Sequence, residues 1–167
     1  SNIRKNYNIK RDDILIGSIG GITSERKPWE ILYLFSSLIK KNRKIKLMLV
    51  GGRESLDDLK KLSEKLKIKE NIIFTGNIEH KDIPKYISSF NYGLAHLPNK
   101  ILLKNSVSLK FLEYLACGIP VLASKIKSNE QIANKLSGVY IYKNSDDIMK
   151  IINKRIIIKT PDNLKDY

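Results

Sequence analysis

Residues 106–124 read SVSLKFLEYLACGIPVLAS, and this stretch contains a helix, its stop and a strand in close succession. A hydroxyl from Ser106 or Ser108 can cap the first turn of a helix, and Gly118 and Pro120 are residue types that end one. The residues from Pro120 onward are small or apolar and predict a short buried strand. A helix that leads directly into such a strand is the repeating unit of an α/β fold.

The alternation of short apolar runs and longer amphipathic segments continues in both directions along the chain. It predicts a Rossmann-like, doubly wound parallel sheet of about six strands with helices on both faces. The expected strands are residues 14–19, 46–50, 71–75, 92–97, 120–123 and 139–142. The expected helices are residues 29–40, 56–66, 81–90, 106–117, a short segment after Ser128, and 146–154. Ser55 and Ser128 have the spacing of capping-box residues, and residues 1–11 and 156–167 are expected to be connecting segments of a single domain, 1–167.

The chain carries 31 Lys and Arg residues against 17 Asp and Glu residues, a net charge of +14. This excess predicts attraction to phosphate in a nucleotide, a nucleic acid or an anionic membrane surface, and codon bias toward lysine is the alternative explanation. One cysteine and two histidines exclude a disulfide framework and a multi-cysteine zinc site. No apolar run reaches the ~18 residues of a membrane span and no signal peptide is evident, which predicts a cytoplasmic protein.

The loop after the first expected strand carries candidate binding residues, because ligands of an open α/β sheet bind at the carboxyl ends of its strands. Gly20 and Gly21 let the backbone approach an anion, and the cations Arg26 and Lys27 follow them. The dinucleotide fingerprint GxGxxG is absent, and a plain β-turn is the alternative interpretation.

The loop after the fourth expected strand ends in a helix start at residues 106–110. A helix N-terminus presents free N–H groups and a partial charge of about +0.5, which favours phosphate. Lys110 lies in the first turn, where a cation is disfavoured unless an anion is bound beside it. Glu113, one turn later, can accept two hydrogen bonds from ribose hydroxyls. A surface pair of Lys110 and Glu113 is the alternative.

The stretch from Ser106 to Ser124 resembles the group-1 (family 4-like) glycosyltransferases of the GT-B fold, whose pattern K-x-x-E-Y-x-A-x-G-x-P-V-x-A-S it matches from Lys110 onward. Lys27, the LVGG at 49–52 and the IFTGNI at 73–78 match the same family. The resemblance covers about residues 14–154 and corresponds to the carboxyl-terminal, donor-binding domain of such an enzyme. In this family a separate amino-terminal domain holds the acceptor.

The resemblance implies a nucleoside diphosphate sugar as the donor substrate and no other cofactor. It implies that Lys27 neutralises the diphosphate, that residues 106–110 cradle it and that Glu113 binds ribose. The turn with Asn77 and Ile78 would meet the base through its backbone. The implied catalytic residues are Lys27 and Glu113, and the implied substrate-binding residues are Gly20, Gly21, Arg26, Asn77, Ile78, Asn105, Ser106, Ser108, Leu109 and Lys110. Fixed cations and N–H dipoles would stabilise the diphosphate as it gains charge in the transition state.

Two positions depart from the family pattern. Asn105 stands eight residues before Glu113, where many members have a glutamate, so the contacts to the donor sugar differ. Ile22 stands five residues before Lys27, where many members have an arginine, and Arg26 is the expected substitute.

No metal site is predicted. The three acidic pairs in the sequence are adjacent residues and lack the D-x-D spacing of metal-dependent transferases. Two of these pairs fit the first turns of helices, where acidic residues complement the helix dipole: Asp57-Asp58 and Asp146-Asp147. His96 and Cys117 are expected to be packing residues.

The expected activity is hexosyltransferase-like transfer from the nucleotide sugar, with retention of configuration and without a metal ion, and little transfer by this domain alone. The first alternative is a non-catalytic nucleotide-binding module that has lost the sugar contact at Asn105. The second is a basic nucleic-acid-binding domain, which the scattered lysines and the lack of an aromatic-rich strand disfavour, so no nucleic-acid partner is expected. A cytoplasmic location is expected, with a peripheral position at the inner face of a membrane, near a lipid-linked acceptor, as the further option.

Overall fold

The computed structural model describes residues 2–21, 24–52, 56–98 and 109–158, and its centre is a parallel sheet. The sheet has six strands in the order β3-β2-β1-β4-β5-β6, and every neighbouring pair is parallel. The strands are β1 Ile14–Ile19, β2 Ile45–Val50, β3 Ile72–Phe74, β4 Tyr92–Ala95, β5 Val121–Ser124 and β6 Val139–Tyr142. The six predicted strands and the doubly wound fold class are therefore confirmed.

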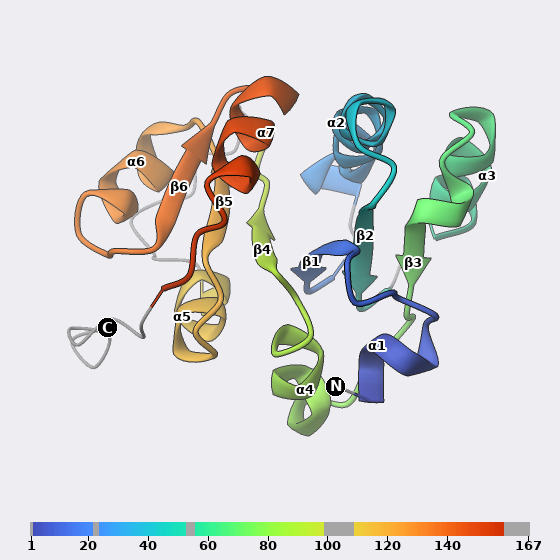
Figure 1. Cartoon of the computed structure of the whole chain (residues 1–167), viewed down its shortest axis with the longest axis horizontal. Helices are drawn as coiled ribbons and strands as arrows, with labels where there is room; N and C mark the ends of the chain where they lie inside the picture. The colour runs from blue at the N-terminus through green and yellow to red at the C-terminus, as the bar shows by residue number, and fades with distance from the viewer. Residues whose placement is uncertain (1, 22–23, 53–55, 99–108, 159–167) are drawn as a thin grey trace.

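Helices cover both faces of this sheet (Figure 1). The α-helices of the described residues are α1 Asn2–Asn6, α2 Pro28–Lys41, α3 Leu56–Lys65, α4 Ile83–Ile87, α5 Leu109–Ala116, α6 Lys127–Ala133 and α7 Ser145–Asn153. One core cluster joins α2, α3 and α7 to the sheet, and the other joins the opposite face to α4, α5 and α6. A strand with helices on both sides is buried on both sides. In β2, accordingly, Leu47 and Leu49 belong to the first cluster while Met48 and Val50 belong to the second.

Helix α5 ends as its sequence predicts. Gly118 has a φ of 71°, in the left-handed region that glycine adopts without strain. The N–H of Gly118 donates to the carbonyl of Leu115 at 2.9 Å, and the N–H of Ile119 donates to that of Tyr114 at 2.9 Å. These two bonds form a Schellman motif, so the chain turns directly from α5 toward β5.

Two predictions about the amino-terminal segment and α6 are wrong. Asn2–Asn6 form a helix where a connecting segment was expected, because Arg4 donates hydrogen bonds to the carbonyls of Ser89 and Asp13. A helix this short has no amphipathic repeat, so tertiary contacts decide its structure. Ser128 lies inside α6, whose N-cap is Ile126, and does not cap it. Residue 55, the other expected capping residue, lies outside the described part of the chain.

The helix expected at residues 81–90 is shorter in the structure. A 3₁₀ turn at His80–Asp82 precedes α4, and Pro84 lies in the first turn of α4. Because proline has no N–H group and is tolerated only in the first turn of an α-helix, α4 cannot extend further toward the amino terminus.

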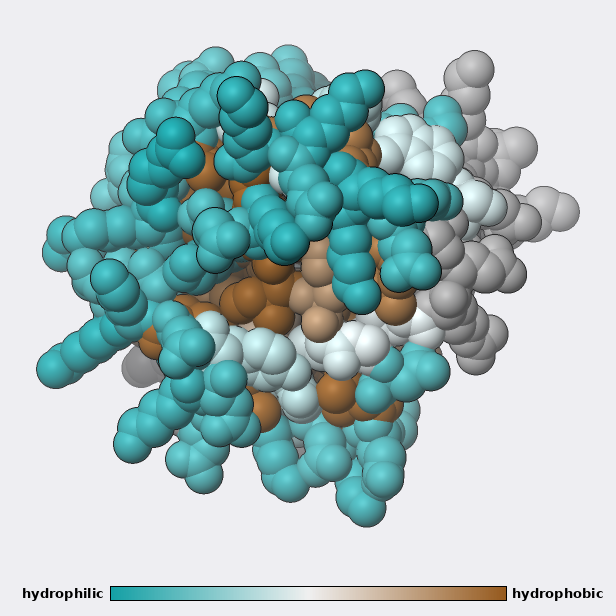
Figure 2. All heavy atoms as spheres, turned by 90° about the vertical axis from the view of Figure 1, so that its right-hand side faces the viewer, coloured by the Kyte–Doolittle hydropathy of each residue, from teal (hydrophilic) through white to brown (hydrophobic). Residues whose placement is uncertain are grey.

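Strand β3 forms one edge of the sheet, on the side that Figure 2 shows. Apolar atoms lie in the middle of this face and hydrophilic side chains surround them. Ile73 and Phe74 of β3 are only partly buried, while α3 on this side carries the exposed Lys60, Lys61 and Lys65. Charged side chains beside a sheet edge oppose pairing with another strand.

The strand order reverses between β1 and β4, which are direct neighbours although most of the first half of the chain lies between them. The helices that follow these two strands, α2 and α5, pack on opposite faces of the sheet. In a doubly wound sheet, this switch point opens a crevice at the carboxyl ends of the strands.

Candidate functional site

A pocket of about 370 Å³ lies at the carboxyl ends of β1, β2 and β3, beside the first turns of α5. It brings together six residues that the sequence analysis predicted for the site: Gly20, Gly21, Asn77, Ile78, Lys110 and Glu113. It also contains Gly51, Gly52, His80 and Ile83, which the predicted site lacks. The pair at 51–52 had a signal in the family match at 49–52, whereas nothing in the sequence pointed to His80 or Ile83.

Backbone forms much of this pocket, because glycines end the strands that border it. Gly20 has a φ of 115° and Gly51 a φ of 109°, values that other residue types rarely adopt. A Cβ atom on Gly51 would lie 2.7 Å from the carbonyl oxygen of Gly20, so the two loops leave no room for a side chain. The N–H of Gly20 donates to Val50 at 3.0 Å and that of Gly51 to Gly76 at 3.1 Å. These bonds hold the three loops together.

The amine of Lys110 lies over the first of these loops. A Cβ atom built on Gly20 would be 3.2 Å from the Lys110 Nζ atom. Burial and, to a smaller extent, repulsion from Arg26 lower the pKa of Lys110 to about 8, although attraction to Glu113 opposes both. Among the side chains that the structure describes, none forms a salt bridge with Lys110. A buried cation that a second cation repels and that has no salt bridge is a suitable environment for an anion.

Tyr114 fixes α5 against the sheet, and with it Lys110 and Glu113. The buried Tyr114 hydroxyl accepts a hydrogen bond from the N–H of Ile19 at 3.0 Å and donates one to the carbonyl of Leu94 at 3.3 Å. Its ring occupies the space that a Cβ atom on Gly93 would need, since the nearest ring atom would be 2.4 Å away. One side chain of α5 therefore contacts both strands of the switch point.

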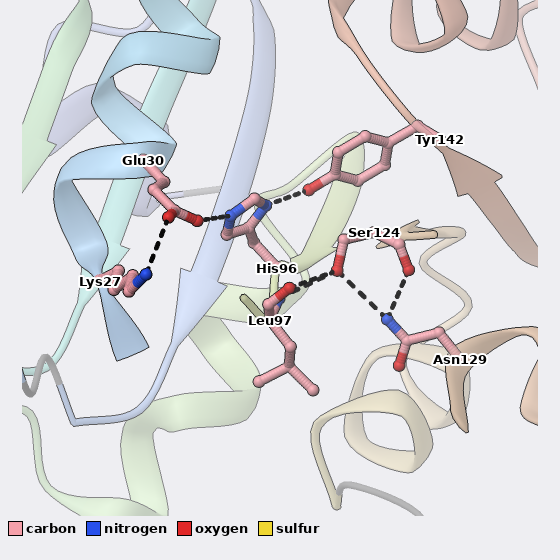
Figure 3. Close-up of polar contacts among 7 residues, drawn as sticks. All are labelled: Lys27, Glu30, His96, Leu97, Ser124, Asn129 and Tyr142. Atoms are coloured by element: carbon pink, nitrogen blue, oxygen red, sulfur yellow. Dashed lines mark hydrogen bonds and ion pairs between the residues drawn. The ribbon is translucent and has the colours of Figure 1, made fainter. Parts of the chain in front are cut away.

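Lys27 lies outside this pocket, at the start of α2. It is the N-cap residue and has a φ of 46°, a left-handed conformation that is uncommon for a residue with a side chain. Its amine is 3.8 Å from Glu30 Oε1. Figure 3 shows that Glu30 points in turn toward His96, which follows β4, and that His96 points toward Tyr142 at the end of β6.

This second group of side chains is more fully paired than Lys110. His96 Nε2 lies 3.4 Å from Glu30 Oε2, and His96 Nδ1 lies 2.7 Å from the Tyr142 hydroxyl. The His96 and Tyr142 rings are stacked, with centroids 6.2 Å apart. Burial lowers the pKa of His96 and raises that of Tyr142, so both are neutral at pH 7. His96 thus has polar contacts as well as the packing expected of it.

Ser124 anchors the loop that carries His96 (Figure 3). Its hydroxyl accepts from the N–H of Leu97 at 3.0 Å and donates to the carbonyl of Leu97 at 3.1 Å. Asn129 of α6 donates to the Ser124 carbonyl at 2.8 Å. The start of the loop after β4 is therefore held by β5 and α6.

The remaining predicted residues divide into four groups. Asn105, Ser106 and Ser108 lie outside the described residues. Leu109 begins α5 and is 72% exposed, next to the pocket but not in its lining. The acidic pairs at 57–58 and 146–147 lie in the first turns of α3 and α7, as predicted. Cys117 is half-buried, and burial raises the pKa of its thiol, which makes it a poor nucleophile.

The chain matches the family model of glycosyl transferases group 1 over residues 1–166. The chain belongs to this family. It is 27% identical over 161 residues to an alpha-monoglucosyldiacylglycerol synthase of Streptococcus pneumoniae (strain ATCC BAA-255 / R6), a match that covers 96% of this chain and 35% of that relative. The matched region lies in the carboxyl-terminal half of the relative.

Solved structures of glycosyltransferases share the fold. Anabaena Alr3699/HepE in complex with UDP superimposes with a TM-score of 0.73 at 16% identity, over 92% of this chain and 42% of HepE. The C-terminal domain of a group 1 family glycosyl transferase (LpcC) from Francisella tularensis gives a TM-score of 0.64 at 20% identity, over 90% of this chain and 80% of that domain. This group 1 chain therefore shares the fold of the C-terminal domain of LpcC, and it spans about a third of its curated relative and two fifths of HepE. Within its described residues no helix is long and apolar enough to cross a membrane.

Proposed function

We propose that this domain binds a UDP-sugar and that the longer protein transfers the sugar to an acceptor held by an amino-terminal domain. The observation that carries the proposal is the position of the Lys110 amine in the pocket, over Gly20 and repelled by Arg26. A diphosphate there would offset both the burial of Lys110 and its repulsion from Arg26. Membership of group 1 and the UDP and UDP-glucose complexes of HepE support the choice of donor.

The order of the residues along the pocket suggests where the ribose and the base of the donor bind. Glu113 follows Lys110 by nearly one turn of α5 and is the acceptor for ribose hydroxyls. Asn77 and Ile78 follow β3, the edge strand, and offer backbone groups to the base. Lys27, across the switch point, is the further cation for the diphosphate.

Catalysis in this proposal depends on stabilising the leaving group. As the bond between the sugar and the diphosphate breaks, negative charge grows on the diphosphate, and cations already in place lower the barrier. Lys27, Arg26 and Lys110 supply this charge without a metal ion, and family resemblance supports retention of configuration. This domain alone would bind donor but transfer little sugar, because the acceptor site belongs to the other domain.

The test is a calorimetric titration of the chain with UDP, GDP, ADP and uridine. The proposal expects UDP to bind more tightly than uridine, because the phosphates contribute, and more tightly than the purine nucleotides. Equal affinity for UDP and uridine would contradict a diphosphate site. Preference for GDP or ADP would keep the phosphate site and overturn the choice of base.

The acceptor in this proposal is linked to a lipid. Support comes from the net charge of +14 and from the diacylglycerol in the name of the pneumococcal relative. The domain would then bind weakly to anionic vesicles, with about 1 kcal/mol for each engaged cation, and would be released as salt rises. Co-sedimentation with vesicles at two salt concentrations measures this. Sub-micromolar binding of RNA or DNA at ~150 mM salt, where nonspecific binding is typically 10⁻⁴–10⁻⁶ M, would instead favour a nucleic-acid-binding domain.

A further inference from the structure

We propose that Glu30 and His96 are positioning residues, which hold the Lys27 amine at the carboxyl edge of the sheet for the donor diphosphate. This proposal rests on the role of Lys27 in the proposed function. The two residues would not touch the donor. They would act through Lys27, by restricting where its amine can be.

Lys27 and Glu30 cannot hold each other in place by themselves. Their side chains are 42% and 39% exposed, and their 3.8 Å contact joins positions i and i+3 of α2. Exposed ion pairs of this kind are worth little, because both side chains lose freedom and water screens the charges. A third contact is needed to keep Glu30 in one orientation.

His96 provides that contact. Its side chain is only 13% exposed, and its ring stacks on Tyr142. The Glu30 carboxylate can only accept a hydrogen bond, so the proton of the neutral imidazole is on Nε2, and Nδ1 accepts from the Tyr142 hydroxyl at 2.7 Å. Nε2 then donates to Glu30 Oε2 at 3.4 Å, which leaves Oε1 facing Lys27. A polar network runs from the core to the surface through Tyr142, His96, Glu30 and Lys27 (Figure 3).

The position of this polar network explains why a donor site would need the network. Tyr142 ends β6, His96 follows β4, and both Glu30 and Lys27 begin α2. The polar network therefore joins the two halves of the sheet across the switch point, where ligands of doubly wound folds bind. Hydrogen bonds also hold the backbone of Lys27, whose N–H donates to the Ser24 carbonyl at 2.9 Å and whose carbonyl accepts from the N–H of Glu30 at 2.9 Å.

The opposite role for Glu30 makes a contrary prediction. If Glu30 only competed with phosphate for Lys27, removal of its negative charge would strengthen UDP binding. If Glu30 positions Lys27, the same change weakens UDP binding. Glu30→Gln keeps the size of the side chain and removes the charge, so the direction of the change distinguishes the two roles.

The experiment measures UDP and uridine affinity by calorimetry for the chain and for Lys27→Met, Glu30→Gln and the double variant. Positioning predicts that Glu30→Gln weakens UDP binding about threefold to tenfold, as expected for coupled neighbours, and leaves uridine binding unchanged. In the Lys27→Met background, Glu30→Gln should have no further effect on UDP binding. Tighter UDP binding by Glu30→Gln, or an equal loss in both backgrounds, overturns the proposal.

His96 is tested by two variants. His96→Phe removes the donor to Glu30 and should weaken UDP binding as Glu30→Gln does, while His96→Gln can still donate to Glu30 and should restore most of it. If His96→Phe fails to unfold cooperatively in a thermal melt, the test of the proposal rests on the double-mutant cycle of Lys27→Met and Glu30→Gln alone. Loss by both His96 variants to the same degree contradicts the assignment.

A control separates this proposal from the proposed function. Asp146→Asn breaks the Lys41–Asp146 pair at the other end of α2 and should leave UDP binding unchanged. If Lys27→Met does not weaken UDP binding, the proposed role of Lys27 is wrong. If Lys27→Met weakens it and Glu30→Gln does not, only the positioning role is wrong.

Discussion

Lys110 and Lys27, which flank the switch point, differ in burial and in pairing with acidic groups. Lys110 lies over the backbone of Gly20 without a salt bridge to any described residue, and burial and repulsion from Arg26 lower its pKa to about 8. Lys27 is 42% exposed and faces Glu30, which His96 holds from the other side. The comparison teaches that the free domain keeps one cation in an unfavourable environment and compensates the other. An anion gains most where the charge is uncompensated.

The largest expected effect comes from Lys110→Met. It should weaken UDP binding by about 2–5 kcal/mol, the range for losing one partner of a close charge pair, and leave uridine binding nearly unchanged. The same variant should raise the free energy of unfolding of the free domain by about 1 kcal/mol, because the lowered pKa means that the folded state disfavours the charged lysine. Calorimetry and urea unfolding measure the two effects.

Lys27→Met is the matched control for the stability effect. Because Lys27 is exposed and paired, its loss should not stabilise the domain. Equal changes in unfolding free energy for the two lysine variants would remove the contrast between them.

Glu113→Ala should have the next largest effect. It removes the proposed acceptor for ribose hydroxyls and should weaken binding by ~1.5–3 kcal/mol, the range for hydrogen bonds to a charged group. Since ribose is common to both ligands, UDP and uridine should lose the same amount, unlike in Lys110→Met. Unchanged affinity in a folded variant would place Glu113 outside the site.

A smaller effect is expected from pH. A bound diphosphate favours the protonated form of Lys110, so UDP affinity should be constant below the free pKa of about 8 and fall as pH rises above it. The limit is about tenfold for each pH unit. Titrations at pH 7, 8 and 9 measure this, with Lys110→Arg as the control, because arginine stays charged and should flatten the profile. A constant affinity up to pH 9 in the unsubstituted domain contradicts the assignment.

The smallest effect concerns His96. Burial lowers its pKa below 6.5, and Glu30 only partly opposes this shift. The unfolded chain therefore binds the proton first as pH falls, so the stability from neutral His96 is complete above pH 6.5 and is lost below it. The difference in unfolding free energy between the domain and His96→Gln should change by less than about 1 kcal/mol between pH 7 and 5. No change in this difference would mean that His96 titrates normally.

Local signals explain how much of this molecule could be predicted from its sequence. Each strand is an apolar run, and α5 ends at Gly118 because glycine tolerates the left-handed conformation there. These elements can therefore be predicted from the sequence. Asn2–Asn6 were not, because their helix depends on contacts of Arg4 with distant carbonyls. The start of α6 was also misplaced, since no side chain caps it.

The site divides in the same way. The carboxyl-edge rule and the family pattern predicted Gly20, Lys110 and Glu113, and the structure brings them into one pocket. Contacts between distant segments supplied the rest: the lowered pKa of Lys110 and the partners of His96 depend on which loops meet. The spacing of residues along the sequence carries no information about which distant loops contact each other.

The Tyr114 hydroxyl has a consequence for folding. Its hydrogen bond with Ile19 joins residues 95 positions apart, so the pocket closes only when an early strand and a late helix have both docked. A loop of that length forms late because its closure costs more chain entropy than a local contact. A nucleotide in this pocket can therefore bind only the complete domain. It would stabilise the native state by RT ln(1 + [L]/Kd), and its concentration would protect the entire chain, including elements far from the ligand, against unfolding.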